Sequence, residues 1–152
     1  MSDVLLRGFI HLTREERSSV LSKITVKYSS KIAWPWLRKL GRRDPTKVYA
    51  RTLGNTIYFD KPKAHMLRDD GISLIFEKLF RHELEHMYQS YHYGKWSFSL
   101  YYWYFIFNAL LKQPLKPYEA YLSNPFEISA EVASRVFPLT LEEQALFVQG
   151  KE

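Results

Sequence analysis

Residues 81–94 read RHELEHMYQSYHYG and contain two closely spaced histidines. His82 and His86 lie four residues apart, so on an α-helix their imidazole rings project to the same side. That spacing suits two bonds from the rings to one metal ion. Glu83 follows the first histidine directly and would reach a water molecule held at such an ion. The stretch therefore predicts a helix that carries a metal centre.

The helix is predicted to run from about Gly71 to Tyr93, with Asp69 or Asp70 as its N-cap and Gly94 at its end. Apolar residues lie in two adjacent rows along it. One row holds Ile75 and Leu79 and continues through the histidine pair, and the other holds Phe76, Phe80, Leu84 and Met87. A helix with so wide an apolar surface is largely buried, so we expect the histidines in the interior.

The pattern H-E-x-x-H is typical of zinc hydrolases. In this chemistry Glu83 takes the proton of the zinc-bound water, while zinc polarises the scissile carbonyl. The competing interpretation is a solvated helix face of His and Glu. Because the histidine pair continues an apolar row, the sequence favours a zinc site over a solvated face.

The third zinc ligand has two candidates. The longer signature H-E-x-x-H-x-x-G-x-x-H would place it at His92, but Gln89 stands where that signature needs its glycine. On a continuous helix His92 points about 120° away from His86. The methionines are Met1, Met66 and Met87, so no Met-turn follows residue 92. His92 is therefore not expected to bind the metal.

The second candidate lies in NPFEISAE (124–131), a helix start with Asn124 as N-cap and proline at the first helical position. Glu127 and Glu131 are one turn apart, so one could bind zinc while the other accepts the second N–H of a ligand histidine. Glu127 is also the N3 residue of a capping box, which would explain it without metal. Glu131 has no role in capping, and we expect it to be buried among its apolar neighbours, where an unpaired carboxylate is costly. Both interpretations stay open.

HELEH followed some forty residues later by E-x-x-A-E resembles the gluzincin metallopeptidases. The run H-E-L-x-H-x-x-Q, an aromatic segment and N-P-F-E-x-x-A is similar to small bacterial and phage proteins related to a peptidase-like domain of contractile injection systems. The resemblance covers residues 47–134. It implies His82, His86 and Glu127 as zinc ligands, Glu83 as general base, and Glu131 in a supporting place usually held by Asp. It also implies that an edge strand before the active helix pairs with substrate, and TIYFD (56–60) is expected to be that strand.

The expected fold is α+β: a single, minimal zincin-like domain with a short β-hairpin or antiparallel sheet packed on the active-site helix, and further helices. Residues 1–46 form an N-terminal helical and loop segment, 47–134 the metallopeptidase-like core, and 135–152 a C-terminal helix. KVYARTL (47–53) and TIYFD (56–60) flank Gly54-Asn55 and predict the hairpin. Thr13 and Thr140 each begin a capping box, so a helix is expected after each of them.

The 152 residues carry a net charge of +6 and contain no cysteine, which excludes disulfides, thiolate metal sites and a cysteine nucleophile. Basic residues cluster at 36–47 and 61–63, where the sequence favours a solvated face over nucleic-acid contact. The N-terminus does not read as a signal peptide. We expect a cytoplasmic or virion-associated protein, or one that belongs to an assembly.

The aromatic segment 98–111 is too short for a spanning helix, since 14 residues stand against the roughly 20 required. We expect it in the core, packed on the zinc helix or against another protein, with contact to a membrane surface as the alternative.

The predicted function is zinc-dependent hydrolysis of peptide bonds in a peptide or protein substrate. The alternative is a non-enzymatic component of a phage particle or a secretion or injection assembly that keeps the scaffold. An intact Glu83 favours the enzyme, because a purely structural zinc site needs no general base. A hydrogen-bond donor for the oxyanion is expected among His92, Tyr88, Tyr118 and Tyr121, of which His92 and Tyr121 are the leading candidates.

Overall fold

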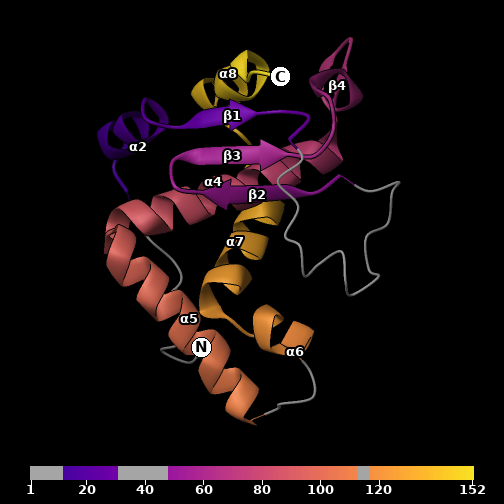
Figure 1. The fold of residues 1–152 in the computed structure, drawn as a ribbon. Helices are drawn as coiled ribbons and strands as arrows, with labels where there is room; N and C mark the ends of the chain where they lie inside the picture. The colour runs from indigo at the N-terminus through magenta and orange to yellow at the C-terminus, as the bar shows by residue number, and fades with distance from the viewer. Residues whose placement is uncertain (1–11, 31–47, 113–116) are drawn as a thin grey trace.

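The computed structural model describes residues 12–30, 48–112 and 117–152 (Figure 1). Within them the helices are α2 (Arg14–Leu21), α4 (Leu74–Tyr93), α5 (Lys95–Lys112), α6 (Pro117–Leu122), α7 (Pro125–Val136) and α8 (Leu141–Gln149). The strands are β1 (Thr25–Lys27), β2 (Ala50–Leu53), β3 (Thr56–Phe59), β4 (Leu67–Arg68) and β5 (Gly71–Ile72), with a short 3₁₀ turn, η1 (Lys63–His65). This confirms the α+β class. The basic run 36–47 lies outside the described residues.

Three strands form the main sheet in the order β1-β3-β2. The predicted hairpin is confirmed: β2 and β3 are antiparallel around Gly54, whose φ of 63° is cheap only for glycine. β1 joins β3 in parallel. The strand expected at the sheet edge, TIYFD, is therefore the central one, and the strand beside α4 is β2.

The C-terminus extends this sheet beside β1. Lys151 donates to the carbonyl of Val26 and accepts from the backbone N–H of Tyr28. Gly150 makes the approach possible, because a Cβ there would lie 2.4 Å from the Tyr28 ring. The C-terminal helix α8 is thereby fixed over the sheet.

Helix α4 begins three residues later than predicted. Asp69 and Asp70 form the turn of a small hairpin in which Arg68 pairs with Gly71, so they do not cap the helix. Acidic residues before a glycine favour a turn as much as an N-cap, and the turn forms here. Ser73 is the N-cap, without a side-chain hydrogen bond, and Gly94 ends the helix with φ 82° as predicted.

The core lies between the sheet, α4 and α8. The rings of Phe59 (β3), Phe80 (α4) and Phe147 (α8) pack with centroids 5.0–6.2 Å apart, and all three are fully buried. Burial along α4 starts at Phe80. Ile75, expected on the buried row, is 72 % exposed because the first turn of α4 extends past the core.

Side-chain caps set the starts of α2, α7 and α8. Thr13 with Glu16 and Thr140 with Glu143 form the two predicted capping boxes. Asn124 caps α7 by accepting a hydrogen bond from the N–H of Phe126 at 3.0 Å. α7 packs against α4, and α5 and α6 lie beside it in the lower half of Figure 1.

The aromatic segment forms most of α5. The prediction that it lies in the core is wrong for the outer side of this helix. No side chain of α5 is fully buried. Trp103, which we expect to be buried against the zinc helix or in a contact with another protein, is 46 % exposed in the single chain. Only the side that carries Phe98 and Tyr102 packs inward, onto Phe126 of α7. Among the described residues, no helix has the length and apolar character needed to cross a membrane.

Candidate metal centre

Helix α4 presents His82 and His86 one turn apart in the interior. Their rings meet edge to face with centroids 4.9 Å apart, and the two Nε2 atoms are separated by 3.2 Å. The side chains are 17 % and 10 % exposed, so the expectation that this row lies inside holds at the histidines. Two imidazole nitrogens thus face one point.

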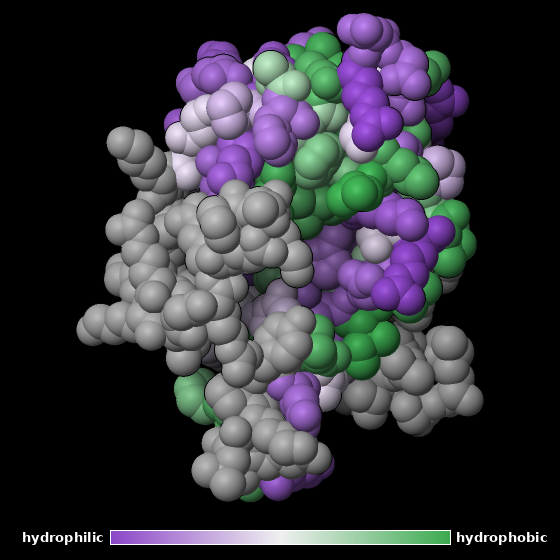
Figure 2. Space-filling model, turned by 90° about the vertical axis from the view of Figure 1, so that its right-hand side faces the viewer, coloured by the Kyte–Doolittle hydropathy of each residue, from purple (hydrophilic) through white to green (hydrophobic). Residues whose placement is uncertain are grey.

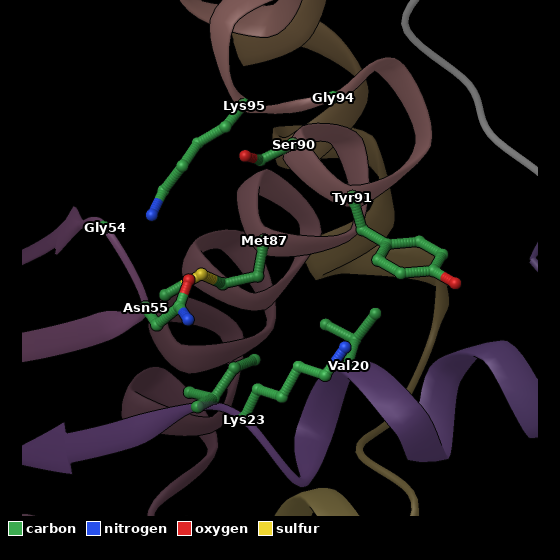
Figure 3. Close-up of a pocket in the computed structure, with 10 residues that line it drawn as sticks. Val20, Lys23, Gly54, Asn55, Met87, Ser90, Tyr91, Gly94 and Lys95 are labelled. Carbon is green, nitrogen blue, oxygen red and sulfur yellow. The ribbon is translucent and has the colours of Figure 1, made fainter.

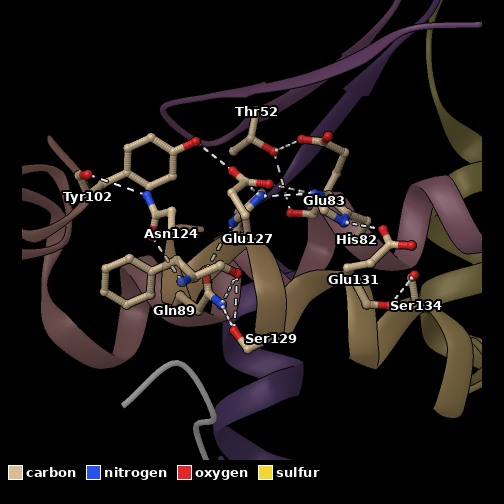
Figure 4. Close-up of polar contacts among 12 residues, drawn as sticks. Thr52, His82, Glu83, Gln89, Tyr102, Asn124, Glu127, Ser129, Glu131 and Ser134 are labelled. Carbon is tan, nitrogen blue, oxygen red and sulfur yellow. Dashed lines mark hydrogen bonds and ion pairs between the residues drawn. The ribbon is translucent and has the colours of Figure 1, made fainter. Parts of the chain in front are cut away.

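Glu127, in the first turn of α7, points its carboxylate at the same place (Figure 4). Its Oε2 lies 3.1 Å from His82 Nε2, and its Oε1 lies 3.3 Å from His86 Nε2. One ligand atom from each of the three residues can be chosen so that all lie within 4.8 Å of one another. Two residues from α4 and one from α7, 41 positions after the second histidine, therefore converge.

The capping interpretation of Glu127 is wrong. The N–H of Asn124 donates to the carbonyl of Tyr121, not to Glu127. Asn124 caps the helix alone, which leaves the Glu127 side chain to the histidines. Glu127 is 4 % exposed, and its carboxylate is buried where its partners are the two imidazole rings and two phenols.

Gln89 orients His86, a role that the sequence analysis missed. Its Oε1 lies 3.0 Å from His86 Nδ1, while its Nε2 donates to the carbonyl of Phe126 and to Ser129 Oγ. The amide oxygen accepts, so His86 carries its proton on Nδ1 and presents Nε2 toward Glu127. A glutamine seven residues after His82 on the same helix was the available signal, but its partners lie on α7.

Glu131 lies at the other histidine. Its Oε2 is 3.6 Å from His82 Nδ1, the nitrogen that points away from Glu127. The expectation that Glu131 is buried is wrong: the side chain is 52 % exposed and pairs with Arg135 at 2.8 Å. One turn along α7 from Glu127, the chain has reached the rim of the site.

Tyr102 reaches Glu127 from α5 and donates its phenol proton to Oε1 at 2.5 Å. Burial, followed by the charge of Glu127, raises the pKa of Tyr102, so the phenol stays protonated. Tyr121 of α6 also hydrogen-bonds to Glu127, and burial likewise raises its pKa. Tyr121 was a candidate from the sequence, whereas Tyr102 could not be distinguished within a run of aromatic residues.

Glu83 is 8 % exposed and lies beside the histidines on α4. Thr52 of β2 donates its hydroxyl proton to Glu83 Oε2 at 2.7 Å. The sheet therefore fixes the orientation of this carboxylate. Thr52 is a third residue, after Gln89 and Tyr102, that could not be found from the sequence, because its contact depends on how β2 lies against α4.

The charges of the site are coupled. Burial alone would lower the pKa of His86, but the charge and hydrogen bond of Glu127 outweigh it and raise the pKa to about 9. Burial would raise the pKa of Glu127, and His86 together with hydrogen bonds from its neighbours holds it far below its ordinary value. At neutral pH the metal-free chain therefore holds an imidazolium–carboxylate pair, from which a metal would displace a proton.

His92 and Tyr88 do not join the cluster. His92 is exposed in the last turn of α4 and packs against Tyr93, with ring centroids 4.9 Å apart. Tyr88 is buried and donates to Glu143 of α8 at 3.0 Å. The side chain of Tyr118 lies outside the described part of the chain.

The surface is hollowed in more than one place. The face drawn in Figure 2 has a hollow near its middle, with hydrophilic residues in and beside it and hydrophobic residues above and below it. A second hollow, of about 250 Å³, lies at the C-terminal end of α4 and is lined by Met87, Asn55, Lys23 and Lys95 among others (Figure 3). None of the three clustered ligand residues lines this second hollow.

A scan against models of protein families gives no match to this chain, and searches of curated proteins and of solved structures give none either. The assignment of a function therefore rests on the geometry and chemistry of the site alone.

Proposed function

We propose that the protein is a zinc-dependent hydrolase of peptide bonds, with a zincin-like arrangement of its active-site helix. The observation that carries the proposal is the convergence of His82, His86 and Glu127 beside the carboxylate of Glu83. Two imidazoles and one carboxylate are a ligand set of catalytic zinc sites. Zinc in this set supplies Lewis acidity, which polarises a carbonyl and makes water more acidic.

Glu83 acts as the general base. Its carboxylate accepts a proton from the attacking water, and the oxygen of that water forms a bond to the carbonyl carbon of the substrate. When the C–N bond breaks, the same proton passes from Glu83 to the departing amine nitrogen. Thr52 supports this role, because its hydrogen bond at 2.7 Å holds the carboxylate while leaving the second oxygen available.

The phenols of Tyr102 and Tyr121 supply the polar surroundings of the reaction. Both keep their protons at neutral pH, since their pKa values are raised. Tyr102 holds Glu127 in place. Of the two residues expected to donate a hydrogen bond to the developing oxyanion, Tyr121 is the one at the site, and its phenol would have to turn from Glu127 to the substrate to do so.

The alternative, a scaffold component of a phage particle or a secretion or injection assembly, would need the metal ligands alone. Glu83 argues for catalysis, because a carboxylate that is only 8 % exposed costs stability and contributes nothing to holding a structural metal. Its hydrogen bond to Thr52 of β2 reduces that cost by satisfying one carboxylate oxygen.

The test has two parts, made on the full chain. Elemental analysis of the purified protein is expected to give about one zinc per chain. A mixed peptide library is then incubated with the wild type, with Glu83→Gln and with Glu15→Gln as an exposed control. We expect cleavage by the wild type and the control, and none by Glu83→Gln, which still binds zinc. Absence of metal removes the proposal, and cleavage by Glu83→Gln removes Glu83 from the mechanism.

A further inference from the structure

Helix α5 is largely apolar between its ends, but the described residues of the chain cover only one of its sides. From Trp96 to Leu111 it contains no charged residue. Phe98 and Tyr102 pack inward on Phe126, with ring centroids 5.0 and 6.5 Å apart. The opposite side faces outward, and Trp96, Leu100 and Leu111 are 85, 72 and 83 % exposed there. A helix that is apolar all round is ordinarily covered all round.

The exposed residues form one continuous face. They recur at i, i+4, i+7, i+8, i+11 and i+15, which at about 100° per residue confines them to an arc of roughly 100°. We name this the α5 face, and it consists of Trp96, Leu100, Trp103, Tyr104, Phe107 and Leu111. Apolar patches of this kind mark a surface that contacts a partner or a membrane.

Charge decides between the occupants of the α5 face. The helix carries Lys95 at one end and Lys112 at the other, and contains no acidic residue. At about 100° per residue, Lys95 and Lys112 lie outside the α5 face, one beyond each edge, so positive charge flanks the face. A second copy of the chain would bring further lysines to the same flanks. Lys23 adds a further ammonium group, because it lines the hollow that Lys95 also lines (Figure 3). The face therefore suits a negatively charged partner surface.

Composition points to a lipid surface. Trp and Tyr concentrate at membrane–water interfaces, where the ring lies among acyl chains and its polar group reaches the headgroups. Lysines at the ends of such a helix can extend to anionic headgroups. The chain as a whole carries a net charge of +6, which adds to the attraction.

We propose that the α5 face lies on an anionic membrane surface, with its aromatic side chains at the level of the headgroups and the helix parallel to the bilayer. The 18 residues of α5 would place about 27 Å of helix along that plane. The inference goes beyond the proposed hydrolase and does not depend on it, since none of the six residues touches the metal cluster.

The experiment is co-sedimentation of the full-length protein with vesicles of phosphatidylcholine, or of phosphatidylcholine with phosphatidylserine. We expect binding to the anionic vesicles, weaker binding to the neutral ones, and a loss as salt screens the charges. Leu100→Ser with Phe107→Ser should lower the affinity at least tenfold. Leu141→Ser is the matched control, because Leu141 is 84 % exposed on α8. Thermal unfolding verifies that each variant is folded.

A charge test separates lipid from other occupants. Reversal of both Lys95 and Lys112 to Glu should weaken binding to anionic vesicles more than the same reversal of Lys27 and Lys78, which are exposed elsewhere. Protein that stays in the supernatant with anionic vesicles overturns the proposal. So does a dimer in sedimentation velocity that Leu100→Ser with Phe107→Ser dissociates while no vesicle binds, since the occupant is then a second copy.

Discussion

Glu127 is the residue on which the site depends most. A carboxylate that is 4 % exposed is expensive to bury unless its charge is balanced. The protonated His86 balances it in the metal-free chain, as the raised pKa of about 9 indicates. A divalent ion would balance it more fully, and would be held by the same oxygen atoms that now contact the two rings.

Removal of Glu127 is therefore expected to affect metal binding more than any other single carboxylate. Glu127→Ala should weaken zinc binding by more than the 10–100-fold that loss of a supporting residue typically costs. Glu131→Ala should fall within about that range, and His92→Ala should leave the affinity unchanged. Titration with zinc in a competing chelator measures all three. Zinc lost from His92→Ala and kept by Glu127→Ala would make the longer histidine signature the correct one.

Tyr102 positions Glu127 without contacting the metal. Tyr102→Phe keeps the ring that packs on Phe126 but removes the proton donated at 2.5 Å. We expect zinc affinity to fall about tenfold, with little change in melting temperature when zinc is absent. Tyr101→Phe is the matched control, because Tyr101 is 51 % exposed on the same helix. Equal zinc affinity in Tyr102→Phe and Tyr101→Phe would show that the hydrogen bond has no positioning role.

Which of these residues the sequence could predict follows from how local their signals are. His82, Glu83 and His86 lie within one turn of one helix, so periodicity alone brings them together. Glu127 could be named because it lies one turn before Glu131 and matches the second motif of the resemblance, although its position at the helix start also allowed a capping role. Thr52 and Tyr102 approach from β2 and α5, and no spacing along the chain encodes those approaches.

Helix α4 carries two charged groups of residues on different sides. One side carries the histidine pair, and another carries Arg81, which forms a buried ion pair with Glu143 of α8. Glu85 lies near the same arginine and is 9 % exposed. Two features were mispredicted from the sequence: the residue at which α4 starts, and the burial of the outer side of α5. Both lie away from these buried side chains. There local propensity offers several solutions, and packing decides among them.

Glu85 is expected to destabilise the fold at neutral pH. Burial raises its pKa, and Arg81 and Arg17 offset this only in part. When the pKa of a carboxyl group is higher in the folded than in the unfolded state, the protonated group favours folding. This contribution to stability is fully present at a pH below the unfolded-state pKa, about 4.3, and is lost as the pH rises through the folded-state pKa. Glu85→Gln should therefore raise the melting temperature at pH 7, and the gain should disappear below about pH 4.

Thermal unfolding from pH 3.5 to 8, with chelator present, checks this expectation. Glu142→Gln serves as the control, because Glu142 lies on the exposed side of α8. Arg81 keeps Glu143 as its partner in the variant, so no buried cation is left unpaired. A lower melting temperature for Glu85→Gln than for wild type at pH 7 would contradict the argument.

In the whole molecule, charged side chains of α4 hold it to both α8 and α7. The Arg81–Glu143 pair connects it to α8, next to the Phe80–Phe147 contact. The cluster of His82, His86 and Glu127 connects it to α7. The Arg81–Glu143 pair is surrounded by the hydrophobic core. The cluster of His82, His86 and Glu127 lies among polar groups, and its strength as a contact would depend on whether a metal ion is bound. The sequence predicted both α7 and α8, but it did not predict that α8 rather than α7 would pack into the hydrophobic core.

A metal that binds only the folded chain should consequently stabilise it. At a free zinc concentration of about 1,000 times the dissociation constant, the expected gain is about 4 kcal/mol. For a chain of this size each kcal/mol moves the melting temperature by roughly 2–4 °C, so chelation should lower it by about 10 °C. Glu127→Ala should lose most of this response, because its zinc affinity is much lower at the same free zinc concentration. Leu141→Ser, on α8, should keep the full response. An unchanged melting temperature of the wild type after chelation, in protein shown to contain zinc beforehand, would mean that the ion does not join α4 to α7.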